Sequence, residues 1–303
     1  KLGNVLTEVP TTEEAYQKSG LNWEVFKNPL FYHLEGFDKN FPTDKSAIIR
    51  KTDNALLGYC GKLYEPYQNK EAFNWCAPLV DSGMWTWESA GSLRRGQICW
   101  VLLKQGETQL ISNDIMKDYL MVTWSHDGQK SVQIVPTSIR VVCMNTLQMA
   151  LGDSGLITKV RHTKTIVNRM EEAKELYRIS SAIFKKRNEA FKVLIDEDWN
   201  DNQLEDFAKK LFPIQEGLKG RALTHAQNVQ EKAIEFIVGD SASGSKELGI
   251  KNTAYGAVMA VSEFNEHYFG GNRVKDRGLI ILFGNGKQLN ERAFNLAKQL
   301  VAA

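Results

Sequence analysis

The chain has 303 residues and a mass of 34.3 kDa, of which 43% are hydrophobic and 24% charged. This composition is typical of a globular protein that buries a large core, and no apolar stretch reaches the ~18 residues of a membrane span. The 38 Lys and Arg residues against 36 Asp and Glu give a net charge of +2. A uniformly basic coat is therefore excluded, but a local basic surface is not.

Cysteine usage points to a reducing compartment. The four cysteines, at positions 60, 76, 99 and 143, include no Cys-x-x-Cys pair. Neither a disulfide framework nor a zinc site is predicted, and a cytoplasmic protein is expected. The chain begins at Lys1 without a Met, which predicts that a few residues precede it.

The first part of the chain predicts a helix, a hairpin and a second helix. Thr11-x-x-Glu14 is a capping-box pattern that opens a short helix. The apolar segments Ala47–Arg50 and Leu56–Tyr64 flank a short polar turn, as the strands of a β-hairpin do. Asn69 then caps a helix whose apolar residues recur at helical spacing.

Two antiparallel strands are predicted next, each with one face toward a core. Trp85 and Trp87 share one face, and alternate residues from Ile98 to Leu102 share another. The turn between them is placed at Gly91-Ser92. Core packing is the simplest interpretation of these tryptophans, because a buried indole removes a large apolar area from water.

A second strand pair, 119–124 and 131–135, is joined by the turn sequence Ser125-His126-Asp127-Gly128. A short helix is expected to follow, capped by Asn145 or Thr146 and ending near Gly152. The first half is therefore predicted to be a meandering antiparallel sheet that carries short helices.

The second half is predicted to be mainly helical. Apolar residues recur every three or four positions from Ile166 to Leu194, which predicts one long amphipathic helix. Arg187 lies on this apolar seam and suggests a partner acid or a phosphate. Four more helices are expected at 201–212, 224–238, 252–269 and 288–301, and the apolar run 278–283 predicts a strand that returns to the sheet.

These patterns predict an α+β protein with a strand-rich lobe at residues 1–155 and a mainly helical lobe at 156–303, joined in one cooperative unit. Charge is unevenly distributed along the second lobe. Residues 156–192 carry a net charge of +6 and residues 193–218 a net charge of −5. The basic segment either forms a face for a polyanion or is neutralised by its acidic neighbour.

The catalytic motifs that the sequence suggests are incomplete. Gly152-Asp-Ser-Gly155 matches a serine-protease nucleophile loop but lacks the following glycine and a suitably placed histidine. Gly284-Asn-Gly-Lys287 lacks the third glycine of a dinucleotide fingerprint and the Ser or Thr of a P-loop. Glu263 and His267 supply two ligands, too few for a metal site. We therefore expect no cofactor and assign no catalytic residue.

Basic residues near aromatic ones carry the main functional signal. Six of the seven tryptophans lie in the strand-rich half, close in sequence to Arg94 and Arg95. Sheets that bind single-stranded nucleic acid combine aromatic faces with guanidinium groups in this way. A second cationic stripe follows from the alternation of Lys159 and Arg161. The candidate nucleic-acid-binding residues are Arg94, Arg95, Arg140, Lys159, Arg161, His162 and Lys164.

Several segments, taken in order, resemble one protein family. They include Leu57–Tyr64, Ala90–Trp100, Arg140–Leu147 and Asn252–Val258. On these motifs the chain is similar to the phage/plasmid-like protein family of unknown function, over nearly its whole length. The resemblance implies a mobile-element protein in the cytoplasm of a bacterial host and supplies no catalytic residue.

The leading hypothesis is a phage- or plasmid-encoded protein that binds single-stranded DNA and anneals it without hydrolysing nucleotides. Its outline resembles that of single-strand annealing recombinases, which work as rings or filaments, so we expect a homo-oligomer. Two alternatives stay open. One is a protein-interaction module, such as an inhibitor of a host system, which would show an apolar surface patch. The other is an unrecognised nucleic-acid-processing enzyme, with polar groups converging in a pocket.

Overall fold

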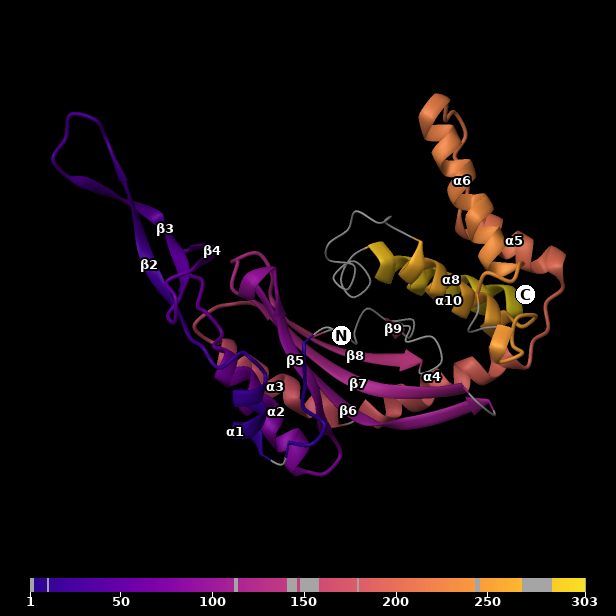
Figure 1. The fold of residues 1–303 in the computed structure, drawn as a ribbon, viewed down its shortest axis with the longest axis horizontal. Helices are drawn as coiled ribbons and strands as arrows, with labels where there is room; N and C mark the ends of the chain where they lie inside the picture. The colour runs from indigo at the N-terminus through magenta and orange to yellow at the C-terminus, as the bar shows by residue number, and fades with distance from the viewer. Residues whose placement is uncertain are drawn as a thin grey trace. The chain divides into compact units, whose positions relative to one another are not determined.

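The computed structural model describes residues 3–9, 11–111, 114–140, 146–147, 158–178, 180–242, 246–268 and 285–302, with the side chains at 114, 138–140, 146–147, 174–178, 180–183, 285 and 287 excepted. The fold is α+β, with a strand-rich antiparallel N-terminal half and a mainly helical C-terminal half, as predicted (Figure 1). In chain order the elements are β1 (Asn4–Val5), α1 (Thr12–Lys18), β2 (Val25–His33), β3 (Asn40–Arg50), β4 (Leu56–Gly61), α2 (Asn69–Asp81), β5 (Thr86–Leu93), the 3-10 turn η1 (Arg94–Gly96), β6 (Ile98–Ile111), β7 (Asp114–Ser125), β8 (Val132–Arg140), β9 (Thr146–Leu147), β10 (Thr158–Val160), α3 (Ile166–Arg178), α4 (Ser180–Ile195), α5 (Asp201–Leu211), α6 (Gly220–Ile237), α8 (Ala254–His267) and α10 (Asn285–Val301).

Within the part of the chain that the structure describes, the strands form two sheets. The larger sheet has seven strands in the order β1-β5-β6-β7-β8-β10, and β9 pairs with β8. The smaller sheet has the order β2-β3-β4. Each pairing for which the residue register is described is antiparallel. Neighbours along the chain are mostly neighbours in the sheet, as in the predicted meander.

The chain divides into two compact units whose segments alternate along the sequence. Strands β6, β7 and β8 each run from one unit into the other. The predicted lobe boundary between residues 155 and 156 lies outside the described residues. The first unit comprises Lys1–Gly106, Tyr119–Pro136 and Gly155–Ser180, and the second comprises Glu107–Asp118, Thr137–Ser154 and Ser181–Ala303.

The core of the first unit uses the predicted tryptophans. Trp85 and Trp87 are buried, and Trp87 stacks on Phe73 of α2 with ring centroids 5.5 Å apart. Tyr16 of α1 meets the edge of Phe73 at 5.4 Å. On β6 the fully buried residues are Cys99, Val101 and Leu103 rather than the predicted alternate set, because both faces of this strand are apolar and periodicity does not distinguish them.

The turn between β5 and β6 lies at Arg94–Gln97, and the prediction of Gly91-Ser92 is wrong. Leu93 pairs with Ile98, while Gly91 lies inside β5 opposite Trp100. A Cβ atom at Gly91 would lie 2.8 Å from the Cα atom of Gly3 and 3.2 Å from the Trp100 ring. Gly91 therefore permits two backbones to approach each other closely. In the sequence, a glycine with this role inside a strand looks the same as a glycine in a turn.

Two helix predictions also need correction. Gln68, not Asn69, caps α2, and its side chain and that of Glu71 form a capping box. Thr146–Leu147 is a strand that pairs with Ser138 and Ile139 of β8, so the predicted helix does not begin there. The remainder of that predicted helix, the 152–155 motif and the predicted strand 278–283 lie outside the described residues.

The apolar seam of the predicted long helix is buried along α3 and α4, which the structure describes on either side of residue 179. Ile166, Met170 and Phe191 are each at most 3% exposed. Arg187 lies on the same seam and pairs with Asp118 of β7 at 2.8 Å, with both side chains buried. The predicted partner acid of Arg187 is thus confirmed.

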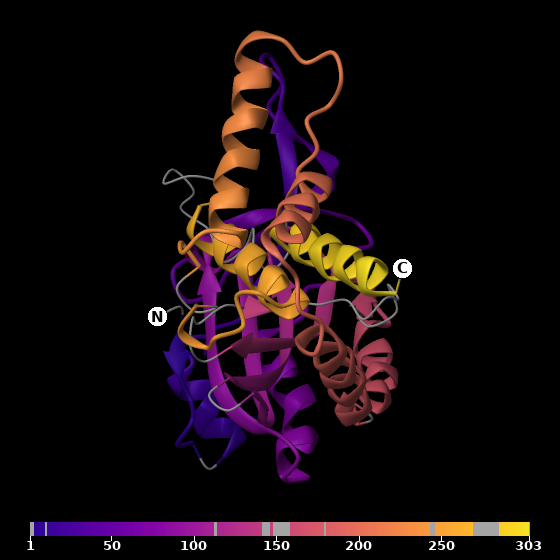
Figure 2. The same cartoon turned by 90° about the vertical axis from the view of Figure 1, so that its right-hand side faces the viewer.

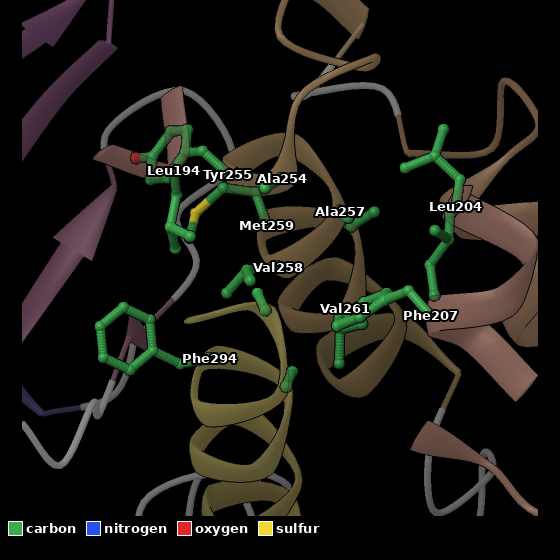
Figure 3. Close-up of a cluster of buried hydrophobic side chains, with 14 of the residues drawn as sticks. Leu194, Leu204, Phe207, Ala254, Tyr255, Ala257, Val258, Met259, Val261 and Phe294 are labelled. Carbon is green, nitrogen blue, oxygen red and sulfur yellow. The ribbon is translucent and has the colours of Figure 1, made fainter. Parts of the chain in front are cut away.

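The core of the second unit is a cluster of helices around α8 (Figure 3). Helix α10 packs along α8 (Figure 1, Figure 2). Helices α5 and α6 pack on each other, and α5 also contacts α10 while α6 contacts α8. Phe191 of α4 meets Tyr255 and Phe294 edge-on at 5.1 and 5.9 Å. Among the helices described, none combines the length and the apolar character needed to cross a bilayer.

Strands β2 and β3 form an arm that was not predicted from the sequence (Figure 1). The first residue of β3 that pairs with β4 is Lys45, so the distal part of the arm has two strands only. Residues 31–40 are all exposed. Without a buried face this segment lacks the alternation by which strands are recognised, and Pro29 further weakens the strand signal.

Candidate nucleic-acid interface

Two segments of the first unit are basic and contain no acidic residue. Residues 89–106 include Arg94, Arg95 and Lys104, and residues 155–170 include four Lys or Arg residues, with no Asp or Glu in either segment. Arg94, Arg95, Lys159, Arg161 and Lys164 are exposed. Within the described ranges, no ion pair joins Arg95, Lys159, Arg161 or Lys164 to a carboxylate.

The second basic segment has the predicted alternation. Strand β10 pairs with β8, with Lys159 opposite Gln133. Lys159 and Arg161 are exposed, whereas Val160 and His162 are only 4% and 6% exposed. A strand places alternate side chains on opposite faces, so Lys159 and Arg161 form the outward stripe and His162 points into the unit.

The first basic segment has an unusual backbone conformation. Arg94 and Arg95 have φ angles of 50° and 59°, and Gly96 follows with 101°. The left-handed region costs an L-residue with a Cβ atom roughly 1 kcal/mol, so such residues persist where the surroundings hold them. The Arg50 guanidinium donates to the Arg95 carbonyl at 3.0 Å, and the His126 backbone N–H donates to the Gln97 carbonyl at 2.7 Å.

Arg50 is itself fixed by two neighbours, Asp53 and Trp23. Its Nε and Nη2 atoms donate to the two carboxylate oxygens of Asp53 at 2.8 and 2.7 Å, and its guanidinium lies over the Trp23 ring at 5.2 Å. The hydrogen bond from Arg50 lowers the pKa of Asp53 to about 2. Arg50 therefore has a structural role: it holds the backbone of the Arg94–Arg95 turn, whose own side chains are exposed.

Replacing Arg95 by Gly is expected to raise the free energy of unfolding by about 0.5–1 kcal/mol, because glycine adopts φ near 60° without steric cost. Arg95→Ala keeps the strained backbone and removes the same charge, so it serves as the matched variant. Urea titrations of both variants measure the difference. Equal stability of the two variants would show that the turn is not strained.

Asn69 connects the elements behind the turn. Its amide Nδ2 donates to the carbonyls of Leu21 and Trp23 at 2.9 and 3.1 Å. Its Oδ1 accepts from Trp124 Nε1 and from His126 Nε2, each at 2.9 Å. Because Oδ1 can only accept, the neutral His126 ring carries its proton on Nε2. The hydrogen-bonding capacity of Asn69 is thus fully used in the interior.

His162 belongs to the same interior. Its Nδ1 donates to the Glu65 carbonyl at 3.2 Å, and its ring stacks on Tyr64 with centroids 4.6 Å apart. The Tyr64 hydroxyl donates to the Ser125 carbonyl at 2.8 Å. Burial lowers the pKa of His162 to about 4 and that of His126 to about 3. His162 is therefore neutral and positions its neighbours, and its ring does not reach the surface as a nucleic-acid ligand.

The hairpin turn between β7 and β8 brings the two basic segments to one region of the first unit. Its His126 backbone holds the Gln97 carbonyl of the first segment, and its Ser125 carbonyl accepts from Tyr64, which stacks on His162 of the second. Arg140 differs from the other candidates, since it lies in the second unit and its side chain is outside the described residues.

Sequence reasoning missed the residues that support this region. Arg50, Tyr64 and Asn69 carry no pattern that separates them from ordinary surface or capping residues. The turn sequence at 125–128 did predict one part of this support, the β7–β8 hairpin, which contacts both basic segments. Among the described residues no group of three His, Cys, Asp or Glu is placed to hold a metal ion.

Comparisons with known proteins identify the family. No curated protein and no solved structure matches the chain significantly. The family model described as "Domain of unknown function (DUF932)" matches residues 56–280. That match includes both basic segments, the hairpin between β7 and β8, and helix α8. It covers well over half of the 303 residues, and the chain therefore belongs to the DUF932 family.

Proposed function

We propose that this protein binds nucleic acid through phosphate contacts from its two basic segments. The observation that supports the proposal is the set of exposed cations, Arg95, Lys159, Arg161 and Lys164, which no described carboxylate neutralises. Cations that are not paired within the protein are available to replace the counterions of a phosphate backbone. Arg94 neighbours this set on the same turn.

Single-stranded DNA is the proposed ligand, and annealing without nucleotide hydrolysis is the proposed activity. The resemblance to phage/plasmid-like proteins supports a mobile-element setting in a bacterial cell. Such an activity needs many phosphate contacts but no catalytic group, in keeping with the incomplete motifs of the sequence. A homo-oligomer would repeat the basic segments along the strand and increase the overall affinity by multivalency.

Replacing Lys159, Arg161 and Lys164 by Gln is expected to lower the affinity for a single-stranded oligonucleotide by about tenfold or more at low salt. The slope of log affinity against log salt should also decrease in magnitude by about 2, since each phosphate contact to a single strand contributes about 0.7. Fluorescence anisotropy at several salt concentrations measures both quantities.

The matched control replaces Lys18, Lys219 and Arg221 by Gln, which removes the same charge from exposed positions elsewhere. A loss of affinity equal to that of the control would show that only net charge matters. A loss restricted to one base sequence would also contradict the proposal, because phosphate contacts carry no base information.

A protein-binding role is a second candidate, favoured by the tip of the β2–β3 arm. Tyr32 stacks on Phe41 at 5.4 Å, and Phe37 meets Phe41 edge-on at 5.7 Å. Phe37 and Tyr32 are about half exposed, and residues 31–44 carry three acids against one lysine. An acidic aromatic tip repels phosphates and suits an apolar protein surface with a basic rim.

A further inference from the structure

The three-stranded sheet of the first unit has one covered face. Ile48 and Cys60 lie on it and are 0% and 4% exposed. Gly58 shares that face, where an added Cβ atom would lie 2.5 Å from the Cα atom of Asp127 in the β7–β8 turn. The turn that supports the basic segments therefore packs directly against this side of the sheet.

The opposite face of the same sheet is apolar and largely exposed, although Ala47 on its central strand is only 4% exposed. Cross-strand register places Phe26, Ile49 and Leu56 side by side in one row, and Asn28, Ala47 and Tyr59 in the next row. Phe26, Leu56 and Tyr59 are 40%, 51% and 58% exposed. Two aromatic rings and two aliphatic side chains thus occupy one surface of β2, β3 and β4, which we call the aromatic face.

The charges around the aromatic face suit an anionic chain. Lys45 lies on this face by alternation with Ala47 and is exposed. Glu24, beside Phe26, is paired with Lys51 at 3.2 Å and adds no net negative charge. Arg50, which follows Ile49 on β3, lies by the same alternation on the covered face, in register with Val25, and there it donates to the Arg95 carbonyl.

The edges of the three-stranded sheet are poorly suited to pairing with a strand of another molecule. Strands β2 and β4 are the two edges of the sheet. Pro29 removes a backbone donor from β2. On β4 the Leu57 carbonyl accepts from Gln97 Nε2 at 2.6 Å, and the Tyr59 carbonyl lies against Gly128 of the β7–β8 turn. Contact through side chains on the flat face is left as the mode of binding. Aromatic rings exposed on a sheet beside cations bind unstacked bases, since every base has a π-face and a phosphate next to it.

We infer that the aromatic face is a base-stacking platform for single-stranded nucleic acid, with Phe26 and Tyr59 as the stacking residues. This inference rests on the proposed function and specifies its ligand: bases lie on the aromatic face while a neighbouring phosphate reaches Lys45. A duplex keeps its bases paired and stacked within the helix, so it cannot use the platform.

The test compares oligo(dT) with an oligonucleotide of the same length whose nucleotides are abasic. Both carry the same phosphates, and only oligo(dT) can stack. Wild-type protein should bind oligo(dT) about 100-fold more tightly than the abasic oligonucleotide, because each of two stacked bases contributes about tenfold. The double variant Phe26→Leu with Tyr59→Leu should bind both oligonucleotides equally, at the wild-type affinity for the abasic one and with an unchanged salt slope.

Tyr268→Leu is the matched control, since Tyr268 is 40% exposed and lies in the other unit. It should keep the full preference for oligo(dT). Equal binding of both oligonucleotides by the wild type would overturn the stacking platform and leave phosphate binding intact. Absence of binding to either at low salt would overturn the proposed function as well. A change in oligomeric size of the Phe26→Leu, Tyr59→Leu variant in light scattering would assign the face to protein contact and so overturn the inference.

Discussion

Replacing Asp118 by Ala is expected to lower the free energy of unfolding by about 3–5 kcal/mol, because it leaves the Arg187 guanidinium charged and buried without its carboxylate. The two side chains are 7% and 4% exposed and lie 2.8 Å apart. Arg187 also lies against the rings of Phe184 and Phe191 at 5.2 and 5.7 Å. Its Nε atom also donates to Asn188 Oδ1 at 3.1 Å, but a neutral amide oxygen does not replace the charge of the Asp118 carboxylate.

Urea denaturation followed by circular dichroism measures this loss. The double variant Asp118→Leu with Arg187→Met is the matched control, because it replaces the buried pair by apolar side chains of similar size. It should regain most of the stability lost by Asp118→Ala. A cost below about 1 kcal/mol for Asp118→Ala would mean that water reaches Arg187 and that the pair is not part of the core.

Acidification from pH 7.5 to pH 5 is expected to destabilise the first unit by about 2 kcal/mol for each of its two buried histidines. Burial, and for His126 also the neighbouring His162, lowers their pKa values to about 3 and about 4. The Glu65 and Lys130 carbonyls and the Asp127 carboxylate act in the opposite direction on His162.

The sign follows from the unfolded chain, where a histidine has a pKa near 6.5. Below that pH the unfolded state binds protons that the folded state does not, so stability is complete above pH 6.5 and declines as the pH falls toward 4. Tryptophan fluorescence reports on this unit, because six of the seven tryptophans lie in it. Urea midpoints at several pH values give the slope.

Matched variants separate the buried histidines from other titrating groups. His162→Gln should reduce the pH-dependent loss by about half, whereas His225→Gln, a substitution at the surface of the second unit, should leave it unchanged. An unfolding free energy that is the same at pH 7.5 and pH 5 would contradict the assignment of two buried neutral rings.

Periodicity predicted the helices well, because a helix that packs on a core shows its buried stripe in the sequence. The seam through Ile166, Arg187 and Leu194 is buried, and Arg187 has the acidic partner that a charge on such a seam requires. The identity of that partner was not predictable, since Asp118 lies 69 positions away on a strand. Local patterns contain no information on long-range pairing.

The candidate interface was predictable in its cations and not in its supports. Lys159 and Arg161 are exposed by simple alternation. The left-handed backbone at Arg94 and Arg95 was not predictable, because Arg50 holds it from another strand. The aromatic face was missed for a similar reason: its rows join residues from three strands, and register is set by tertiary packing.

Nucleic-acid binding through the exposed cations can be measured with the wild-type protein and a fluorescent single-stranded oligonucleotide. Anisotropy titrations at about 50 mM and about 200 mM salt should show binding at the lower concentration and an affinity about 50-fold weaker at the higher one, as expected for four phosphate contacts. No binding at 50 mM salt, or an affinity that does not change with salt, would contradict the account.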